Sequence, residues 1–358
     1  MIGSKSSRIP SLDGLRAVSI VLVIVGHLSW NARSQSPLLT AIRRGLWSQS
    51  TLGVSIFFVI SGFLITSLLV AERESTGKID IARFYIRRSF RILPAFLVYL
   101  GALVIASQLH WLSLNPSDFR SALFFYWNYI PQHHDALLSH TWSLSMEEQF
   151  YLLWPLTLAI VGKKRGRIIA LALIVLAPIL RFGTFHLFPS LQGITGVMLH
   201  TRIDALMFGC AIALWKDDGR FWDVIRKAFR FRAHFIAAIL LFAGLPFIIP
   251  RLPGRIRLPF GYSIEELCIS LILVHVVIYP ESWAGKFLNW RPVAYLGVLS
   301  YILYLWQQPF TFDNSLWIAR SFPLNLLAAA FAAQLSYSLI ERPFLRLRTG
   351  LIRGTMKT

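Results

Sequence analysis

The fold of this chain is decided by residues 11–30, SLDGLRAVSIVLVIVGHLSW. Every residue from Ala17 to Gly26 is apolar or small, so the stretch predicts one apolar helix with Asp13 and Arg16 at its beginning and His27 near its end. Arg16 and His27 are eleven residues apart, which is roughly 16 Å along a helix axis. Ionisable side chains inside a membrane span are costly and by default mark a functional site. The alternatives are a headgroup anchor for Arg16 and a packing histidine for His27.

The composition is typical of a polytopic membrane protein. The chain has 358 residues, of which 55% are hydrophobic and only 15% are charged, and a soluble domain of this length carries far more charge. The net charge of +19 is explained by lysine and arginine on the cytoplasmic side of a membrane, so we expect no nucleic-acid partner. Cys210 and Cys268 lie in apolar segments and are interpreted as packing residues.

Nine further apolar stretches and the positions of the basic residues predict the topology. The stretches are 48–71, 92–110, a helix from near Trp142 to Lys163, 168–186, 197–215, 235–250, 262–282, 293–312 and 322–341. Residues 119–130 would span roughly 18 Å as a helix, which is too short to cross, so we expect a re-entrant or interfacial segment. Ten spans with both termini cytoplasmic then place the basic segments 72–91, 163–167 and 216–234 and the basic tail in the cytoplasm.

The regions between and after the spans complete this organisation. A polar connection with Arg33, Arg43 and Arg44 follows the first helix, and the exception to the charge rule is a group of outward arginines at Arg251, Arg255 and Arg257. Residues 1–345 are expected to form one membrane domain, and residues 346–358, with Arg353 and Lys357, a basic cytoplasmic tail. The first apolar run lacks a cleavage pattern, so it is interpreted as a first membrane helix and not as a signal peptide.

The first candidate binding surface is the basic stretch before the third apolar segment. Arg88 and Arg91 are three residues apart and share a helix face, with Arg87 beside them. Guanidinium groups bind phosphate bidentately, so such a face at the cytoplasmic boundary suits a polyphosphate. Asp13 and Arg16 are expected at the same membrane level. The alternative is simple anchoring of the helix by basic residues.

The second candidate is a polar stripe on the helix that begins near Trp142. Ser143, Glu147 and Tyr151 are spaced by four residues and share one face, with Glu148 adjacent. Two acids entering a span are costly unless they are paired or catalytic. The alternative is an ordinary helix N-terminus, where carboxylates are favourable.

Two weaker candidates lie later in the chain. Arg202 and Asp204 are two residues apart and cannot face each other on a helix, so each needs a partner on another helix, and a buried structural ion pair explains them as well. Tyr304 lies in the segment 300–309, SYILYLWQQP, whose tyrosines and glutamines line one side and suit a polar ligand or aromatic packing. Glu341, Arg342 and Pro343 are interpreted as the end of the last helix.

Together these residues resemble the integral-membrane acyltransferase family 3, whose members O-acylate carbohydrates. The motifs are SLDGLRAVSIVLVIVGH, FFVISGFLI, FYIRRSFRILP, HTWSLSMEEQFYLLWP, RIDALMFGCAIA, SYILYLWQQPF and IERPF, in this order over nearly the whole chain. The resemblance implies an all-α protein with ten membrane helices in the bacterial inner membrane and an acyl-CoA donor, usually acetyl-CoA, without a metal. No esterase-like domain is expected beside the membrane domain.

The resemblance also assigns roles to residues of this chain. The family's first-helix arginine and histidine correspond to Arg16 and His27, its basic pair to Arg88 and Arg91, and its acidic motif to Glu147 and Glu148. Many members have a histidine in a late LYLWH motif, where this chain has Gln307, so no proton transfer is assigned to that position.

These assignments predict a membrane O-acyltransferase that moves an acyl group from cytoplasmic acyl-CoA to a hydroxyl of a carbohydrate or glycoconjugate. His27 is the best general base because its ordinary pKa lies near operating pH, and Glu147 or Glu148 would orient it. Arg16, Arg87, Arg88 and Arg91 would hold the CoA phosphates, with supporting roles for Asp13, Ser143, Tyr151, Arg202, Asp204 and Tyr304. The alternative is a proton-coupled exporter or flippase of a sugar or lipid-linked sugar, against which the absence of repeated halves in the sequence counts.

Overall fold

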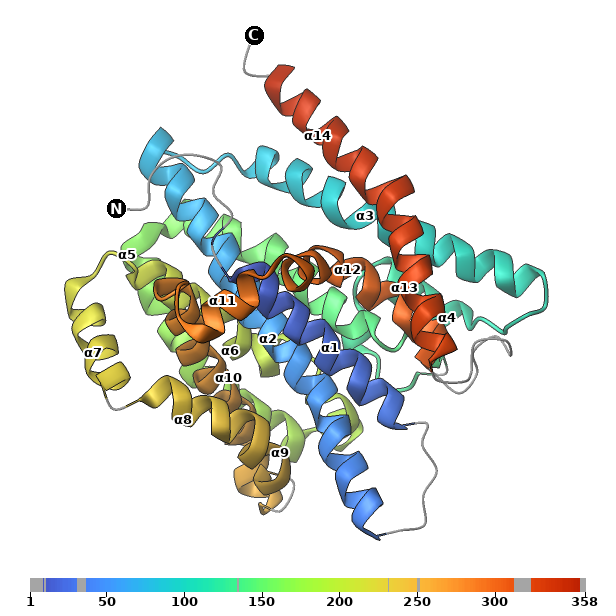
Figure 1. Ribbon diagram of the computed structural model, residues 1–358, viewed down its shortest axis with the longest axis horizontal. Helices are drawn as coiled ribbons and strands as arrows, with labels where there is room; N and C mark the ends of the chain where they lie inside the picture. Colours follow the sequence, from blue (N-terminus) through green and yellow to red (C-terminus); the bar gives the residue numbers. More distant parts are fainter. Residues whose placement is uncertain are drawn as a thin grey trace. The chain divides into compact units, whose positions relative to one another are not determined.

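The computed structural model describes residues 9, 11–30, 37–133, 135–230, 232–249, 252–311 and 323–354. Within them the chain is helical and contains no strand. The α-helices are α1 Leu12–Trp30, α2 Pro37–Thr76, α3 Ile81–Gln108, α4 Pro116–Leu123, α5 Thr141–Leu187, α6 Leu199–Trp215, α7 Gly219–Arg230, α8 Ala233–Ile239, α9 Leu245–Ile248, α10 Gly254–Ile278, α11 Trp283–Asn289, α12 Arg291–Thr311, α13 Leu324–Ser336 and α14 Arg342–Gly354 (Figure 1). The 3₁₀ turns are Trp127–Tyr129, Ala136–Leu138 and Pro189–Ile194, and the π turns are Leu240–Gly244 and Tyr337–Glu341.

Six described segments are long and apolar enough to cross a membrane. They are Gln49–Thr76, Ile81–Gln108, Ala136–Leu187, Pro189–Trp215, Ile256–Ile278 and Leu324–Arg348. An all-helical chain with several spans of this kind satisfies its backbone hydrogen bonds inside each segment, as a membrane requires. The expected all-α, multi-pass class is therefore confirmed, while the count of ten spans and the side of the termini stay predictions.

The chain divides into two compact units. The first unit contains Met1–Ala71, Val161–Gly196 and His200–Ser300, and the second contains Glu72–Ile160, Val197–Leu199 and Tyr301–Thr358. Because the placement of the two units relative to each other is not determined, each is described by itself.

In the first unit, α2 packs against both α1 and α6. The Ser19 hydroxyl of α1 donates a hydrogen bond to the Gly53 carbonyl of α2. On the α6 side, a Cβ added to Gly62 would lie 1.9 Å from the Leu206 carbonyl oxygen, and one added to Gly209 would lie 2.0 Å from that of Val59. These two glycines therefore allow backbone contact between the helices, as small residues do in membrane proteins, and Figure 1 shows α1 beside α2.

The long helix α5 is interrupted at Gly162. This glycine has φ 74° and ψ 178°, a conformation essentially restricted to glycine, so it separates the two spans predicted before and after residues 163–167. Just after it, Lys163 pairs with Asp217 at 2.7 Å and Arg167 with Asp218 at 3.2 Å. The basic run is therefore held against the end of α6.

In the second unit, α3 packs against α5, α12 and α14. The Tyr85 hydroxyl of α3 donates to the Leu152 carbonyl of α5 at 2.8 Å, and the Tyr301 hydroxyl of α12 donates to the Ile92 carbonyl at 2.9 Å. The rings of Phe90 and Phe344 are 6.3 Å apart, which agrees with α14 lying beside α3 in Figure 1. These contacts fix the face of α3 that carries the predicted arginines.

One predicted connection is wrong. Helix α2 begins at residue 37, so Arg43 and Arg44 lie in a helix and not in a polar connection. Helix α3 begins at Ile81, before the apolar segment 92–110, and so contains Arg88 and Arg91 as their spacing predicted. Charged turns at the membrane surface extend these helices beyond their apolar segments, and Asp80 caps α3 by accepting from the Arg83 amide at 2.9 Å.

The end of the last membrane helix was also predicted wrongly. Glu341 ends a π turn that leads directly into α14, so the helical chain continues past residues 341–343 to Gly354. The π turn accommodates Pro343, which has no amide hydrogen to donate. The division into a membrane domain of residues 1–345 and a tail of residues 346–358 stays a prediction.

Residues 119–130 do not form one helix but contribute to α4 and a 3₁₀ turn, and their place in the membrane stays a prediction. Arg33, Arg251 and Lys357 lie outside the described residues. Cys210 and Cys268 are free and buried, in agreement with their interpretation as packing residues.

Candidate active site

The beginning of α1 carries Asp13 and Arg16 beside a pocket of the first unit. Arg16 Nη1 lies 3.5 Å from Asp13 Oδ1, and both side chains are about one-fifth exposed or less. Asp13 lines a cavity of about 590 Å³ together with Lys286 and Asn289. Asn289 accepts a hydrogen bond from the Ser11 amide at 2.8 Å, which fixes the start of α1. The beginning of this helix thus borders a cavity through Ser11 and Asp13.

His27 lies near the other end of α1. Its side chain is partly buried, and the preceding Gly26 packs against Ser50 of α2, where an added Cβ would lie 2.6 Å from the Ser50 Cβ. Since Arg16 and His27 belong to the same uninterrupted helix, their separation of roughly 16 Å along the axis holds.

The second unit brings together Arg88, Tyr151 and Glu148. The Arg88 guanidinium lies over the Tyr151 ring, with Cζ 3.7 Å from the ring centroid. Among the residues that the structure describes, no carboxylate lies within ion-pair distance of Arg88. Its Nε and the Oε1 atom of Glu148 are buried without a hydrogen-bond partner. Buried polar atoms are normally satisfied, so this arrangement is suited to binding a polar ligand.

The other two predicted arginines of α3 have acidic neighbours. Arg87 pairs with Glu72 at 3.1 Å, and Arg91 lies within electrostatic range of Glu341. Arg348 of α14 lies within electrostatic range of both Arg87 and Arg91. Sequence reasoning missed Arg348, because the motif spacing gives no sign that α14 returns to α3. The structure thus enlarges the predicted cationic surface by one residue.

Ser143 and Tyr304 form a buried hydrogen bond between their hydroxyl groups in the second unit. Their hydroxyl oxygens are 2.6 Å apart, and the Tyr304 hydroxyl donates to the His140 carbonyl at 2.8 Å. The predicted polar stripe on α5 therefore joins α12 through Ser143 and α3 through Tyr151. Gln307, at the position of the family histidine, accepts from Thr311 at 2.9 Å and donates to Gln308 at 3.0 Å, so its amide is occupied by neighbours.

Arg202 and Asp204 belong to a buried charge network in the first unit, formed by Arg181, Arg202, Asp204 and Glu266. Arg181 Nη2 lies 2.6 Å from Asp204 Oδ2, and Arg202 Nη2 lies 3.7 Å from Glu266 Oε1. All four side chains are fully buried. Each predicted residue thus has an ion-pair partner on another helix, as the spacing of two residues requires.

Hydrogen bonds extend this network between α2, α5, α6 and α10. Arg181 also donates to the Thr201 and Pro259 carbonyls, at 2.7 Å each, and Arg202 donates to the Ser55 hydroxyl at 2.7 Å. The Tyr262 ring lies under the Arg202 guanidinium at 3.8 Å. The partners Arg181 and Glu266 were missed, although a charged residue inside an apolar stretch was the signal that could have found them.

The predicted site residues are therefore distributed over both units. The second unit brings together Arg88, Glu148 and Tyr151, and separately Ser143 and Tyr304. Arg16 and His27 belong to the first unit and Glu147 to the second, so an encounter of His27 with the acids stays a prediction. Among the described residues no cluster of histidine, cysteine and acidic side chains suits a metal ion.

Comparison with known proteins gives the family. An acyltransferase domain model matches residues 9–339. The O-acetyltransferase OatA of Staphylococcus aureus is 32% identical over 94% of this chain, and the Bacillus subtilis protein named "Putative peptidoglycan O-acetyltransferase YrhL" is 30% identical over 94%. The chain spans 57% and 54% of these relatives' lengths, respectively. No solved structure matches it. Because the domain model covers nearly the whole sequence, the chain belongs to the family of membrane acyltransferase domains.

Proposed function

We propose that this protein is a membrane O-acetyltransferase that transfers an acetyl group from cytoplasmic acetyl-CoA to a hydroxyl of a cell-surface glycan. The family match over residues 9–339 carries this proposal. The names of the relatives supply the reaction, O-acetylation, and one of them names peptidoglycan as the acceptor. The protein would act in the bacterial inner membrane, between the cytoplasmic donor and the exported glycan.

The arginines of α3 are proposed to bind the CoA phosphates. Arg88 supports this role best, because among the described residues no carboxylate lies within ion-pair distance of its guanidinium, Glu148 acts on it only at longer range, and its Nε is unsatisfied. Arg87 and Arg91 add positive charge on the same helix, and Arg348 adds more from α14. Guanidinium groups form strong charge-assisted hydrogen bonds with phosphate. Arg16 at the beginning of α1 would contribute from the first unit.

His27 is proposed as the general base. In the transfer step, the acceptor hydroxyl oxygen forms a bond to the thioester carbonyl carbon, the C–S bond breaks, and the hydroxyl proton passes through the imidazole to the CoA thiolate. The roughly 16 Å between Arg16 and His27 is of the order of an extended pantetheine arm. A route through an acyl-histidine would use the same imidazole as a nucleophile in two steps. An imidazole nitrogen forms a bond to the carbonyl carbon as the C–S bond breaks, and the acceptor oxygen then bonds that carbon as the C–N bond breaks, with the hydroxyl proton passing to the CoA thiolate. Glu147 or Glu148 would orient the ring and stabilise its charged form.

The test is an acetyl-transfer assay with the full chain in lipid nanodiscs. Acetyl-CoA labelled in the acetyl group is supplied with soluble peptidoglycan fragments, and both free CoA and glycan-bound acetyl ester are measured. The proposal predicts equal amounts of both products, dependent on the acceptor. Hydrolysis without ester formation would contradict the glycan acceptor. No consumption of acetyl-CoA, together with glycan transport in liposomes, would support the exporter instead.

A further inference from the structure

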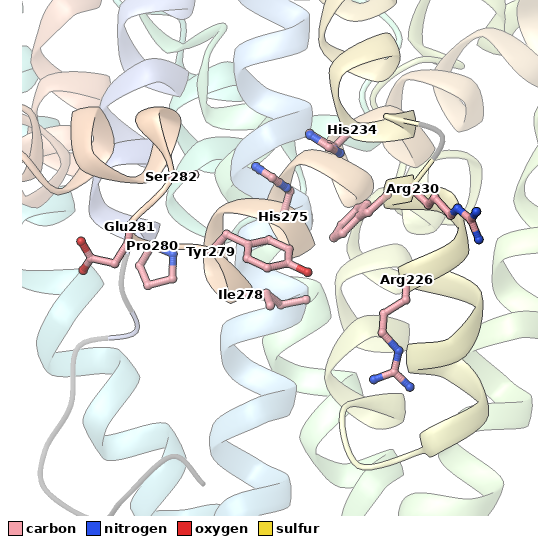
Figure 2. A pocket seen from close by; sticks show the side chains of 10 residues that line it. Arg226, Arg230, His234, His275, Ile278, Tyr279, Pro280, Glu281 and Ser282 are labelled. Atoms are coloured by element: carbon pink, nitrogen blue, oxygen red, sulfur yellow. The ribbon is translucent and has the colours of Figure 1, made fainter.

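None of the residues that line a second cavity of the first unit is assigned above to catalysis or to CoA, although this cavity shares Pro280 and the carboxylate-bearing Glu281 with the cavity that Asp13 lines. The second cavity has a volume of about 700 Å³, within the range of small-molecule sites. Figure 2 shows that α7 and α8 form one side and the end of α10 and the connection to α11 the other. Its lining residues are Arg226, Phe229, Arg230, His234, His275, Ile278, Tyr279, Pro280, Glu281 and Ser282.

Two arginines give this cavity its positive charge. Arg226 and Arg230 are four residues apart on α7 and therefore lie on one face of that helix, and both line the cavity (Figure 2). Arg226 pairs with Asp223 at 2.6 Å, but both side chains are about two-thirds exposed, and such surface pairs are weak. Arg230 makes no hydrogen bond or ion pair with any residue that the structure describes. The cavity therefore offers one free and one weakly engaged guanidinium to an anion.

The cavity also carries two stacked imidazoles with spare hydrogen-bonding capacity, His234 from α8 and His275 from α10. The rings of His234 and His275 are 3.8 Å apart and nearly parallel, at 4°, and Phe229 meets both edge-on. The Nδ1 atom of each imidazole is buried without a hydrogen-bond partner. Burial and the nearby Arg232 lower the pKa of His234, so this ring is neutral at neutral pH. A neutral imidazole can donate one hydrogen bond and accept another.

The surroundings of the cavity indicate an amphiphile. One face of α7, with Phe221, Trp222 and Ile225, packs into the core of the first unit. The other face is basic, which is typical of an interfacial helix on an anionic membrane. Trp283 and Phe287 of the adjacent α11 are 86% and 49% exposed. Exposed aromatic residues of this kind lie at the headgroup level in membrane proteins.

We propose that this cavity binds the phosphodiester headgroup of an anionic phospholipid at the cytoplasmic surface of the membrane. Arg226 and Arg230 would contact the phosphate, and the imidazole Nδ1 atoms would bond the headgroup hydroxyls. The acyl chains would lie along Ile278 and Trp283. A soluble nucleotide fits less well, because the imidazole faces already stack on each other and because the apolar rim would stay uncovered. The predicted side of the membrane follows from the basic segment 216–234.

The experiment measures lipid binding to the full chain in detergent by native mass spectrometry. The probes are dioctanoyl-phosphatidylglycerol, dioctanoyl-phosphatidylcholine, glycerol 1-phosphate and CoA. The test variant is Arg226→Gln/Arg230→Gln. The matched control is Arg220→Gln/Lys227→Gln, which removes two positive charges from the same helix outside the cavity. Non-specific attraction of about 1 kcal/mol per basic residue at a membrane surface should fall equally in both.

We expect saturable binding of one phosphatidylglycerol and binding of phosphatidylcholine weaker by about tenfold or more. Phosphatidylcholine keeps the phosphate, but it lacks the headgroup hydroxyls that the imidazoles would bond, and its trimethylammonium group is repelled by the two arginines. The affinity of the test variant for phosphatidylglycerol should fall about tenfold or more. The affinity of the control variant should fall by less than about threefold. His234→Phe, which keeps the stacked ring without its nitrogens, should weaken binding severalfold. Thermal melting of each variant in detergent checks that it is folded.

Equal losses in the test and control variants would overturn the proposal in favour of diffuse surface attraction. Binding of glycerol 1-phosphate as tight as that of phosphatidylglycerol would show a soluble-phosphate site and would also overturn it. CoA is expected to bind at the α3 arginines, so it overturns the proposal only if the test variant loses CoA affinity as strongly as it loses phosphatidylglycerol affinity. Neither outcome depends on acetyltransferase activity, so this test is separate from that of the proposed function.

Discussion

Two arginines of this chain, Arg202 in the first unit and Arg88 in the second, each lie over a tyrosine ring and near a glutamate but differ in burial and in the distance to that carboxylate. Arg202 is fully buried, 3.7 Å from Glu266 and 2.7 Å from the Ser55 hydroxyl. Arg88 is only partly buried, lies over the Tyr151 ring, and has no carboxylate within ion-pair distance among the described residues. Both arginines have buried nitrogens without a hydrogen-bond partner, Nε in Arg88 and Nε and Nη1 in Arg202. The two therefore differ in burial and in the distance to a carboxylate, and we interpret Arg202 as held by the protein and Arg88 as the one available to a ligand.

This difference separates two roles that look alike in the sequence. A buried ion pair gains its attraction only by offsetting a large desolvation penalty, and breaking it leaves an uncompensated charge. A partly exposed guanidinium incurs a smaller desolvation penalty, and its unsatisfied donor can form a charge-assisted hydrogen bond with a phosphate. We therefore expect mutations in the buried network to act on stability and mutations near Arg88 to act on donor binding.

The largest expected effect is that of Asp204→Leu. It leaves Arg181 buried without its carboxylate partner and removes the acceptor of the Ser263 hydroxyl bond, which should cost about 3–5 kcal/mol. Fluorescence-detected size-exclusion chromatography and thermal melting in detergent measure the loss. The double variant Arg181→Leu/Asp204→Leu removes both charges and should recover much of it. A stable Asp204→Leu protein would contradict the structural role of the network.

A smaller effect, on binding and not on stability, is expected for Arg88→Gln. Loss of one charge-assisted contact to a CoA phosphate should raise KM for acetyl-CoA about tenfold to a hundredfold, while loss of the contact with Tyr151 should change stability by about 1 kcal/mol or less. Steady-state kinetics and thermal melting together test this separation. Arg83→Gln on the same helix serves as the control and should leave KM unchanged. An Arg88 variant that unfolds would contradict the proposal that Arg88 acts on donor binding and not on stability.

Arg87→Gln should affect donor binding less than Arg88→Gln does. Arg87 already pairs with Glu72 at 3.1 Å and is about one-third exposed, and such pairs contribute roughly 1 kcal/mol or less. We expect KM for acetyl-CoA to change by about threefold or less. If Arg87 and Arg88 variants raised KM equally, the carboxylate partner would not be what distinguishes the two arginines.

The smallest effect is expected where α5 and α6 meet at the membrane surface. The hydrogen bond from Lys163 lowers the pKa of Asp217. Its contribution to stability is thus present above its ordinary pKa of about 4 and is lost as the pH falls through the lower folded value. Since Asp217 is 55% exposed, Asp217→Asn should cost about 0.2–1 kcal/mol near neutral pH. Melting curves at pH 7 and pH 3 should show this difference narrowing, and a difference that grew in acid would contradict the assigned sign.

The helical class and the grouping of some site residues were predictable from the sequence. Apolar length predicts membrane helices directly. The spacing of four residues predicts that Ser143 and Tyr151 lie on one face of α5, and the structure adds that they contact Tyr304 and Arg88. The spacing of two residues also predicts separate partners for Arg202 and Asp204.

The partners themselves could not be predicted, because they depend on helix packing. Nothing in the spacing indicates that Arg181 meets Asp204 or that Arg348 approaches Arg91. The helices also extend beyond the predicted spans, because hydropathy marks where a segment leaves the membrane and not where its helical hydrogen bonds end. Helix α2 therefore begins eleven residues before the predicted span, at Pro37.

The central claim is that His27 performs the acyl transfer, and its most direct test is the rate of acceptor-dependent CoA release. The full chain in nanodiscs is compared with His27→Ala at saturating acetyl-CoA and peptidoglycan fragments. Removal of a general base should lower kcat by about 10²–10⁴-fold, with thermal melting and CoA affinity near those of the wild type. Equal rates in the two proteins would contradict the role of His27 and leave the family assignment intact.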